Sequence, residues 1–135
     1  MAELVGIYAA SHGPLIARDW DRLATVFSGD DFVRVGPFVD VIRGSDNYVA
    51  FLKGIVPTLG DTYSLDTERV VYVPDEGEAY AQLIEHYEHD GQMRDTPEII
   101  VFGINDANRI CRMRLYVQRP GERPPVGGED AMGEQ

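Results

Sequence analysis

Two periodicities divide the chain. In its first part, apolar residues recur every three or four positions, which predicts helices at about 3–10, 19–27 and 47–56. Between the second and third helices, a turn at Gly36 and Pro37 predicts a short strand pair at 32–35 and 39–42. From residue 63, patterns typical of strands predict a meander at 63–73, 79–88, 98–104 and 109–119. Helices followed by a run of antiparallel strands indicate an α+β domain.

The alternation within the meander assigns side chains to the two faces of the sheet. The last strand separates an apolar face from a basic one: Cys111, Met113, Leu115 and Val117 against Arg112, Arg114 and Tyr116. In the second strand, Leu83, Glu85 and Tyr87 share one face, so a carboxylate stands between two apolar neighbours. The third strand is interpreted as apolar on both faces. A homodimer through the back of the sheet is therefore expected.

Length, charge and cysteine content narrow the classes of function. The 135 residues fit one domain at 1–119, followed by a Pro/Gly-rich tail at 120–135 that is expected to be disordered. The formal charge of −11 argues against nucleic acid as a partner. There is no apolar run long enough for a membrane span and no signal-like start, and Cys111 is the only cysteine. A cytoplasmic protein is expected.

No cofactor or metal is expected from the motifs. The sequence contains no glycine-rich phosphate loop and no zinc-like Cys/His spacing. His86 and His89 are three residues apart on a predicted strand, which places their side chains on opposite faces.

The order of elements, with the strings ARDWDRLATVFSGDDF, VGPF, RGSDNYVAFL and CRMRLYV, resembles the nuclear transport factor 2-like superfamily over about 3–119. The most similar branches are the SnoaL-like polyketide cyclases, ketosteroid isomerases, limonene-type epoxide hydrolases and scytalone dehydratase. The resemblance implies a cone-shaped barrel, in which a strongly curved antiparallel sheet packs on three N-terminal helices around an apolar pocket. It also implies dimers. The superfamily includes enzymes, binding modules and assembly domains, so the fold alone does not decide the activity.

Transferred residue by residue, the resemblance is partial for the ketosteroid isomerases. Tyr8 falls at their oxyanion-hole tyrosine. Their catalytic base corresponds to Gly36, and their protonated acid corresponds to Ile100, so both carboxylates are missing.

The resemblance to the epoxide hydrolases and to scytalone dehydratase also transfers incompletely. The Arg-x-Asp pair of the epoxide hydrolases reads Leu83-Ile84-Glu85, and their second aspartate corresponds to Leu115. The strand histidine of scytalone dehydratase corresponds to Ala81. No complete mechanism of these branches is retained.

Glu85 is the main catalytic candidate, because a carboxylate in an apolar pocket is suited to acid–base work. Tyr8 is the candidate hydrogen-bond donor to a substrate oxygen. The alternatives are a structural Glu85, held by Arg34 or a neighbouring backbone, and a core tyrosine. Arg34 and His12 are possible further pocket residues. The expected apolar lining comprises Phe38, Phe51, Leu52, Leu83, Tyr87, Ile100, Phe102, Met113, Leu115 and Val117.

Two functions follow from these candidates. The first is a cofactor-independent enzyme that cyclises, isomerises, dehydrates or opens an epoxide of a hydrophobic cyclic, polyketide-like or terpenoid-like molecule. The second is a binding or dimerisation module that keeps the pocket without the chemistry. The inward carboxylate Glu85 favours the enzyme, and the missing second carboxylate favours the module.

Overall fold

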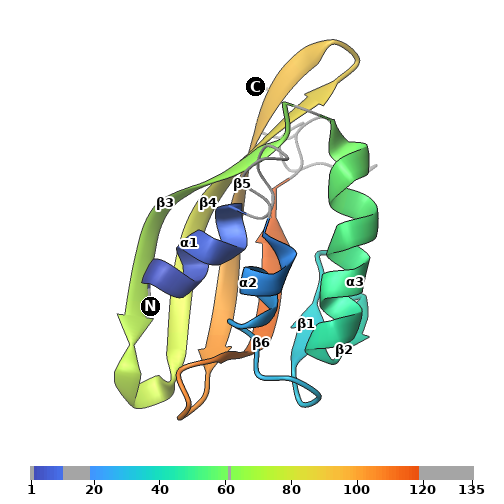
Figure 1. Ribbon diagram of the computed structural model, residues 1–135. Coiled ribbons are helices and arrows are strands. Elements are labelled where there is room, and N and C mark those ends of the chain that lie inside the picture. Colours follow the sequence, from blue (N-terminus) through green and yellow to red (C-terminus); the bar gives the residue numbers. More distant parts are fainter. Residues whose placement is uncertain (1, 11–18, 61, 119–135) are drawn as a thin grey trace.

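A computed structural model describes residues 2–10, 19–60 and 62–118 (Figure 1). The helices are α1 (Ala2–Ala10), α2 (Trp20–Ala24) and α3 (Ser45–Ile55), and the 3-10 helix η2 (Val56–Leu59) continues from α3. The strands are β1 (Val33–Val35), β2 (Val41–Arg43), β3 (Ser64–Val73), β4 (Glu78–His89), β5 (Gln92–Ile104) and β6 (Ile110–Val117). The predicted tail and His12 lie outside the described residues.

The six strands form one sheet in the order β2-β1-β6-β5-β4-β3. The meander is antiparallel as predicted, but β1 pairs in parallel with β6, with Val33 opposite Arg112. The sheet is therefore mixed rather than wholly antiparallel. A parallel pair needs a long connection, and here α3 and the whole meander lie between the two strands in sequence.

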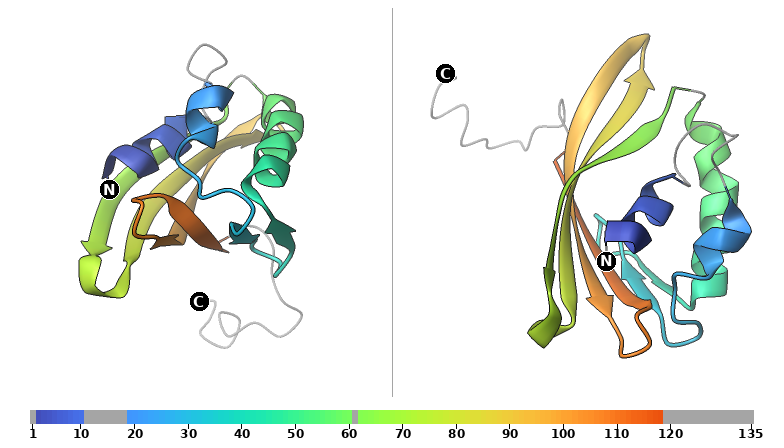
Figure 2. Two further views of the ribbon diagram at one scale, coloured as in Figure 1. Left: turned by 60° about the horizontal axis from the view of Figure 1, so that its bottom comes forward. Right: turned by 60° about the vertical axis from the view of Figure 1, so that its left-hand side comes forward.

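The three helices cover one face of the curved sheet, and no described element covers the opposite face (Figure 2). A core of buried aromatic and aliphatic side chains lies between the helices and the sheet. Its aromatic centre consists of Phe27, Phe32 and Tyr48, whose ring centroids lie 4.7–5.6 Å apart. The α+β class expected from the sequence is confirmed.

The second helix ends earlier than its periodicity predicts. Asp19 caps it by accepting a hydrogen bond from the Arg22 N–H at 3.0 Å, but the helix stops at Ala24. Phe27 instead forms a parallel bridge with Ile110, beside a hydrogen bond from the Ile110 N–H to the Val26 carbonyl. Pairing with the sheet thus replaces the last helical turn.

The third meander strand begins at Gln92, six residues before the predicted start. Pro97 lies inside this strand, opposite Ile84. Its carbonyl faces the β6 side, where it accepts a hydrogen bond from the Gln118 N–H at 3.1 Å. The missing N–H of proline points to the same side, towards Gln118 just beyond the end of β6, so only one bond at the end of the ladder is lost.

No helix in the described part of the chain is long and apolar enough to span a membrane.

Candidate functional site

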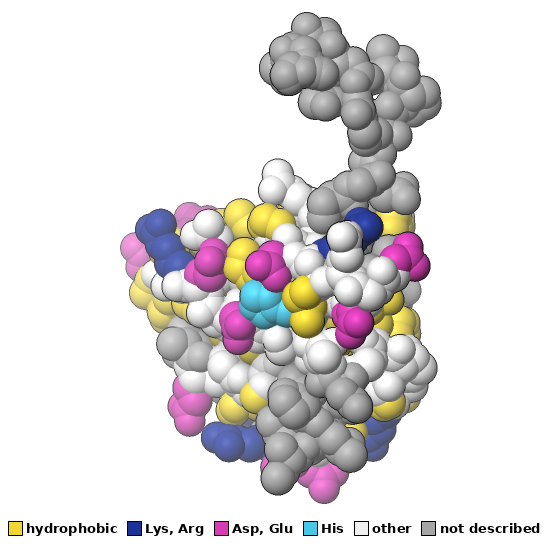
Figure 3. Space-filling model, turned by 90° about the horizontal axis from the view of Figure 1, so that it is seen from above, with side chains coloured by type: hydrophobic (Ala, Val, Ile, Leu, Met, Phe, Trp, Pro, Cys, Tyr) yellow, Lys and Arg dark blue, Asp and Glu magenta, His cyan; other side chains and the backbone are white. Residues whose placement is uncertain are grey.

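A cavity of about 290 Å³ opens between α3, η2 and the ends of the meander strands. Its apolar wall includes Phe51, Ile55, Leu59 and Leu115. Phe51 and Ile55 are partly exposed because they face this cavity rather than the closed core. Seen from above, this end of the molecule carries hydrophobic side chains intermixed with acidic ones (Figure 3).

Glu85 lies in the cavity wall, on the face of β4 that the alternation predicts. Its carboxylate accepts a hydrogen bond from the Tyr63 hydroxyl, with an oxygen–oxygen distance of 2.7 Å. Burial, together with the adjacent Glu85 charge, raises the pKa of Tyr63 far above its usual value. Tyr63 therefore stays protonated and acts as a donor to the carboxylate.

Tyr8 reaches the same cavity from α1 and is almost completely buried. Its hydroxyl lies 3.2 Å from the hydroxyl of Tyr48, which comes from α3. Burial raises the pKa of Tyr8 well above its usual value, and the neighbouring Tyr48 and Glu98 act in the same direction. Burial also raises the pKa of Tyr48 to about 12, against the opposing effects of its hydrogen bond to Tyr8 and the charge of Arg34. Both hydroxyls keep their protons at neutral pH.

Glu98 is a second carboxylate in the cavity, and the sequence reasoning missed it. It is only 6% exposed and lines the cavity from β5. The register places Glu98 opposite Leu83 and Glu85 opposite Thr96, so the two glutamates are diagonal neighbours on one face. Such neighbours lie about 7–8 Å apart. The expectation that the pocket holds a single carboxylate is therefore wrong.

The start assigned to the third strand explains this omission. With the strand beginning at residue 98, Glu98 was its first residue and both faces were interpreted as apolar. In the longer strand, buried Thr96, Glu98, Ile100 and Phe102 alternate with the exposed or half-exposed residues 95, 97, 99 and 101. The buried face of β5 thus begins with two polar residues, and period-two counting across Pro97 could have found them.

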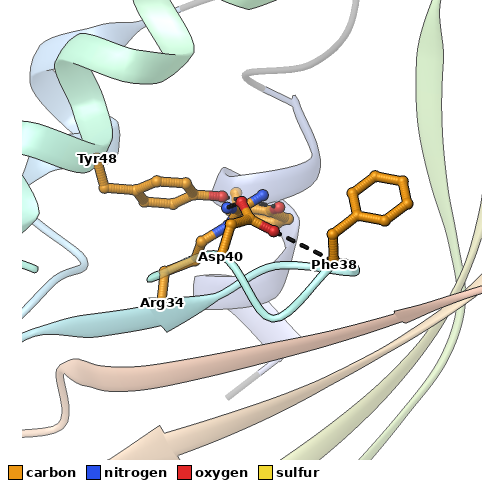
Figure 4. A network of polar contacts seen from close by, with 5 residues as sticks. Arg34, Phe38, Asp40 and Tyr48 are labelled. Atoms are coloured by element: carbon orange, nitrogen blue, oxygen red, sulfur yellow. Dashed lines mark hydrogen bonds and ion pairs between the residues drawn. The ribbon is translucent and has the colours of Figure 1, made fainter. Parts of the chain in front are cut away.

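Arg34 points inward from β1 and is 6% exposed. Its Nη1 donates a hydrogen bond to Asp40 Oδ2 at 2.7 Å, and the other Asp40 oxygen accepts one from the Phe38 N–H at 3.2 Å (Figure 4). The guanidinium carbon lies 5.6 Å from the ring centroid of Tyr48 and 5.4 Å from that of Phe51. Partial burial would raise the pKa of Asp40, but hydrogen bonds from the backbone and Arg34 outweigh it and lower that pKa.

Gly36, where the resemblance places the isomerase base, lies directly under this ion pair. A Cβ built on Gly36 would lie 2.5 Å from Asp40 Oδ1 and 2.6 Å from Arg34 Nη1. Such distances are shorter than real Cβ contacts. The position therefore has no room for a carboxylate while the side-chain ends of Arg34 and Asp40 lie where they do.

The predicted apolar lining divides into two groups. Five of its ten residues line the cavity: Phe51, Leu52, Tyr87, Leu115 and Val117. Four others belong to the closed core, where each is at most 1% exposed: Leu83, Ile100, Phe102 and Met113. The core group is sealed because α1 packs over that part of the sheet, as the edge contact between the rings of Tyr8 and Phe102 shows.

Phe38 is the remaining member of the predicted lining, and its placement was wrong. It is 78% exposed at the tip of the β1–β2 hairpin, and the neighbouring Pro37 lines the cavity in its place. Asp40 accepts the Phe38 N–H and so fixes the turn with the ring directed away from Arg34 (Figure 4).

A metal site does not emerge from the described residues, which contain no group of three His, Cys, Asp or Glu side chains arranged to hold an ion. On the outer face of the sheet, His86 contacts two aspartates, with Nε2 2.8 Å from Asp66 and Nδ1 2.7 Å from Asp95. Both ring nitrogens are thus engaged by carboxylates, as in a protonated imidazole.

Comparison with known proteins gives matches in structure only. No protein-family model matches the chain. No curated protein matches it by sequence either.

Three solved structures illustrate the structural similarity. One, from Kribbella flavida DSM 17836, is assigned as a ketosteroid isomerase; it is 16% identical, with coverage of 98% of this chain and 87% of that one and a TM-score of 0.70. A protein from Jannaschia sp. CCS1, assigned as a SnoaL-like polyketide cyclase, is 17% identical, with 87% and 84% coverage and a TM-score of 0.68. A protein with a ketosteroid isomerase-like fold from Catenulispora acidiphila DSM 44928, solved with trimethylamine, is 12% identical, with 84% coverage of both chains and a TM-score of 0.68.

The chain thus has the fold of the nuclear transport factor 2-like superfamily, as the resemblance in the sequence implied. At these identities the similarity establishes the fold and leaves the activity to be argued from the site.

Proposed function

We propose that the protein is a cofactor-independent acid–base enzyme that acts on a hydrophobic cyclic, polyketide-like or terpenoid-like small molecule. Glu85 is the acid or base, and Tyr8 donates a hydrogen bond to a carbonyl or alkoxide oxygen. The observation that supports this most is the position of Glu85, whose carboxylate lies in the cavity wall beside the Tyr63 hydroxyl. A positioned carboxylate typically contributes about 10²–10⁴-fold to a proton transfer.

Glu98 supports the proposal that the protein is an acid–base enzyme. Isomerisation, dehydration and epoxide opening need one group to remove a proton while another donates one. Two carboxylates that are diagonal neighbours on one face supply both roles, provided that one of them is protonated. The missing second carboxylate was the argument for the binding module, and Glu98 in the cavity wall weakens it.

A non-catalytic binding module is the second candidate. The short hydrogen bond from Tyr63 to Glu85, 2.7 Å between oxygens, favours it. A carboxylate held in this way can serve structure alone, because the bond satisfies a buried tyrosine hydroxyl.

Proton exchange provides a test that does not require the natural substrate. The protein is incubated in D₂O with a panel of cyclic ketones, such as 2-tetralone, and loss of the α-proton signal is followed by ¹H NMR. We expect exchange above the buffer rate with the parent protein, reduced about 10²–10⁴-fold in Glu85→Gln. Thermal denaturation must show that the variant is folded. A folded Glu85→Gln protein that exchanges protons as the parent does would leave the binding module standing.

We further propose that two copies associate through the outer face of the sheet. Ile99 and Tyr116 are 43% and 55% exposed there, on adjacent strands and directly opposite one another. Exposed apolar patches of this kind commonly mark interfaces. A cytoplasmic location is part of the same proposal, since the lone Cys111 fits a reducing compartment.

A further inference from the structure

We propose that the Arg34 guanidinium is the anion-recognition group of the cavity, and that the ligand carries a negatively charged oxygen, a carboxylate or an enolate, on an apolar ring. This inference uses the cavity of the proposed function but concerns binding, so it can hold or fail independently of catalysis by Glu85.

The hydrogen bonds of Arg34 are incomplete. A guanidinium has five N–H donors and does not lose its proton in proteins. Its Nη1 donates a hydrogen bond to Asp40 Oδ2 at 2.7 Å, and the Tyr48 hydroxyl is a second side-chain partner. The Nε atom is buried and has no hydrogen-bond partner. A buried N–H group without an acceptor is unfavourable, so a site of this kind gains from an oxygen supplied by a ligand.

The aromatic neighbours hold the guanidinium in place. The Tyr48 and Phe51 rings are stacked, 6.3 Å apart with an interplanar angle of 15°, and the Arg34 guanidinium carbon lies within 5.6 Å of both centroids. Such contacts attract the cation and position it before a ligand arrives. A preorganised guanidinium loses less conformational freedom on binding a carboxylate than a free side chain would.

The ion pair with Asp40 leaves the Arg34 guanidinium available to a negatively charged ligand oxygen. The Asp40 side chain is 50% exposed, whereas that of Arg34 is 8% exposed, so the pair sits at the rim with its cation turned inward. Solvent screening weakens the hold of a half-exposed carboxylate on its partner. An oxygen entering from the cavity can therefore share Arg34 with Asp40 or replace it.

The opposite wall restricts where the charge of the ligand can lie. Arg34 is on β1 and Glu85 is on β4, and β6 and β5 lie between these strands in the sheet. The backbones of β1 and β4 are therefore three strand spacings of about 4.8 Å apart, or roughly 14 Å. In the proposed acid–base pair one of Glu85 and Glu98 is ionised, and it repels negative charge at this side. A ring with one charged oxygen is thus oriented with the oxygen at Arg34 and its C–H bonds towards the carboxylates.

A matched pair of probes tests the inference. The probes are 2-naphthoate and 2-naphthylmethanol, which share the ring and differ in charge, with dissociation constants measured by calorimetry. We expect the parent protein to prefer naphthoate by about 10- to 100-fold, the range of hydrogen bonds to charged groups. Arg34→Gln should abolish the preference, because it weakens binding of naphthoate far more than binding of the alcohol. Asp40→Asn should strengthen naphthoate binding, because the amide oxygen still accepts the Phe38 N–H while the competing charge is gone.

Equal affinity of the parent for the two probes, or binding of neither at millimolar concentration, would overturn the inference. A preference that survives in Arg34→Gln would overturn it as well. If Arg34→Gln does not fold, Asp40→Asn decides, and unchanged naphthoate affinity in that variant counts against Arg34. Loss of α-proton exchange in Glu85→Gln with the naphthoate preference intact supports both proposals. If the parent protein prefers naphthoate but does not exchange α-protons, only the proposal of catalysis is refuted.

Discussion

Replacing Gly36 with alanine should break the contact that fixes Arg34. The new Cβ would lie 2.5–2.6 Å from Asp40 Oδ1, Asp40 Oδ2 and Arg34 Nη1, so these side-chain ends have to move from the positions in which they pair. The backbone does not prevent the change, because Gly36 is not among the glycines with positive φ. The prediction therefore concerns the pair and not backbone strain.

The expected magnitude follows from the exposure of the pair. Breaking a fully buried pair costs about 3–5 kcal/mol, and a surface pair contributes about 0–1 kcal/mol. With side chains 8% and 50% exposed, Arg34 and Asp40 lie between these limits, at about 2 kcal/mol. Alanine recovers about 0.4–1 kcal/mol by restricting the unfolded chain. The net loss of about 1–2 kcal/mol should lower Tm by about 3–8 °C in a domain of this size.

Thermal denaturation followed by circular dichroism measures this loss, and Gly54→Ala is the control. Gly54 lies in α3 with nothing within 4 Å of its built Cβ, so the same substitution should stabilise the protein by about 0.5–1 kcal/mol. The difference in Tm between Gly36→Ala and the parent should also become smaller at acidic pH. The pair keeps the pKa of Asp40 below 3.8, so its contribution is present above that pH and is lost as the pH falls through the lowered pKa. A Gly36→Ala protein as stable as the parent at pH 7 would refute the reasoning.

Three further predictions concern other parts of the molecule. The hydrogen bond to Asp95 raises the pKa of His86, against a smaller opposing effect of burial, and the hydrogen bond to Asp66 adds to the rise. The stability that this cluster contributes is therefore present below about pH 6.5, and it is lost as the pH rises through the raised pKa of His86. The Tm difference between the parent and His86→Gln should shrink as the pH rises above about 6.5, and a pH-independent difference would contradict this. Ile99→Lys should give a monomer by light scattering at concentrations where the parent is a dimer; a monomeric parent at micromolar concentration would exclude the interface. Tyr8→Phe should slow α-proton exchange by about 10²–10³-fold without unfolding the protein, and an unchanged rate would remove Tyr8 from the mechanism.

The sequence predicted the helices and the meander because these depend on local periodicity. It misjudged elements whose limits depend on distant partners. Phe27 continues a helical pattern but pairs with Ile110, 83 positions later in the sequence. Pro97 suggests a break, yet it is tolerated because its missing N–H faces past the end of β6. Propensity is a weak guide wherever such tertiary contacts decide the outcome.

The site was predictable to the extent that it depends on alternation. Glu85 followed from the pattern of its own strand, whereas Glu98 depended on where the next strand begins. The direction of Arg34 depended on Asp40, which holds it across a turn that no local pattern specifies. Phe38 was misplaced for the same reason, because the turn also aims its ring outward.

The placement of Glu98 and Arg34 bears on why a small domain can retain buried charged groups. Both charges lie at the open end of the sheet, where the cavity replaces close packing. The sealed core under α1 and α2 is almost wholly apolar, with Phe102, Met113 and Leu23 essentially inaccessible. Buried polar groups are tolerated when packing elsewhere supplies the stability, and sites with perturbed polar residues are commonly functional for this reason. The division of the inner face into a sealed apolar end and an open end with charged side chains is therefore the arrangement expected of a binding or catalytic domain.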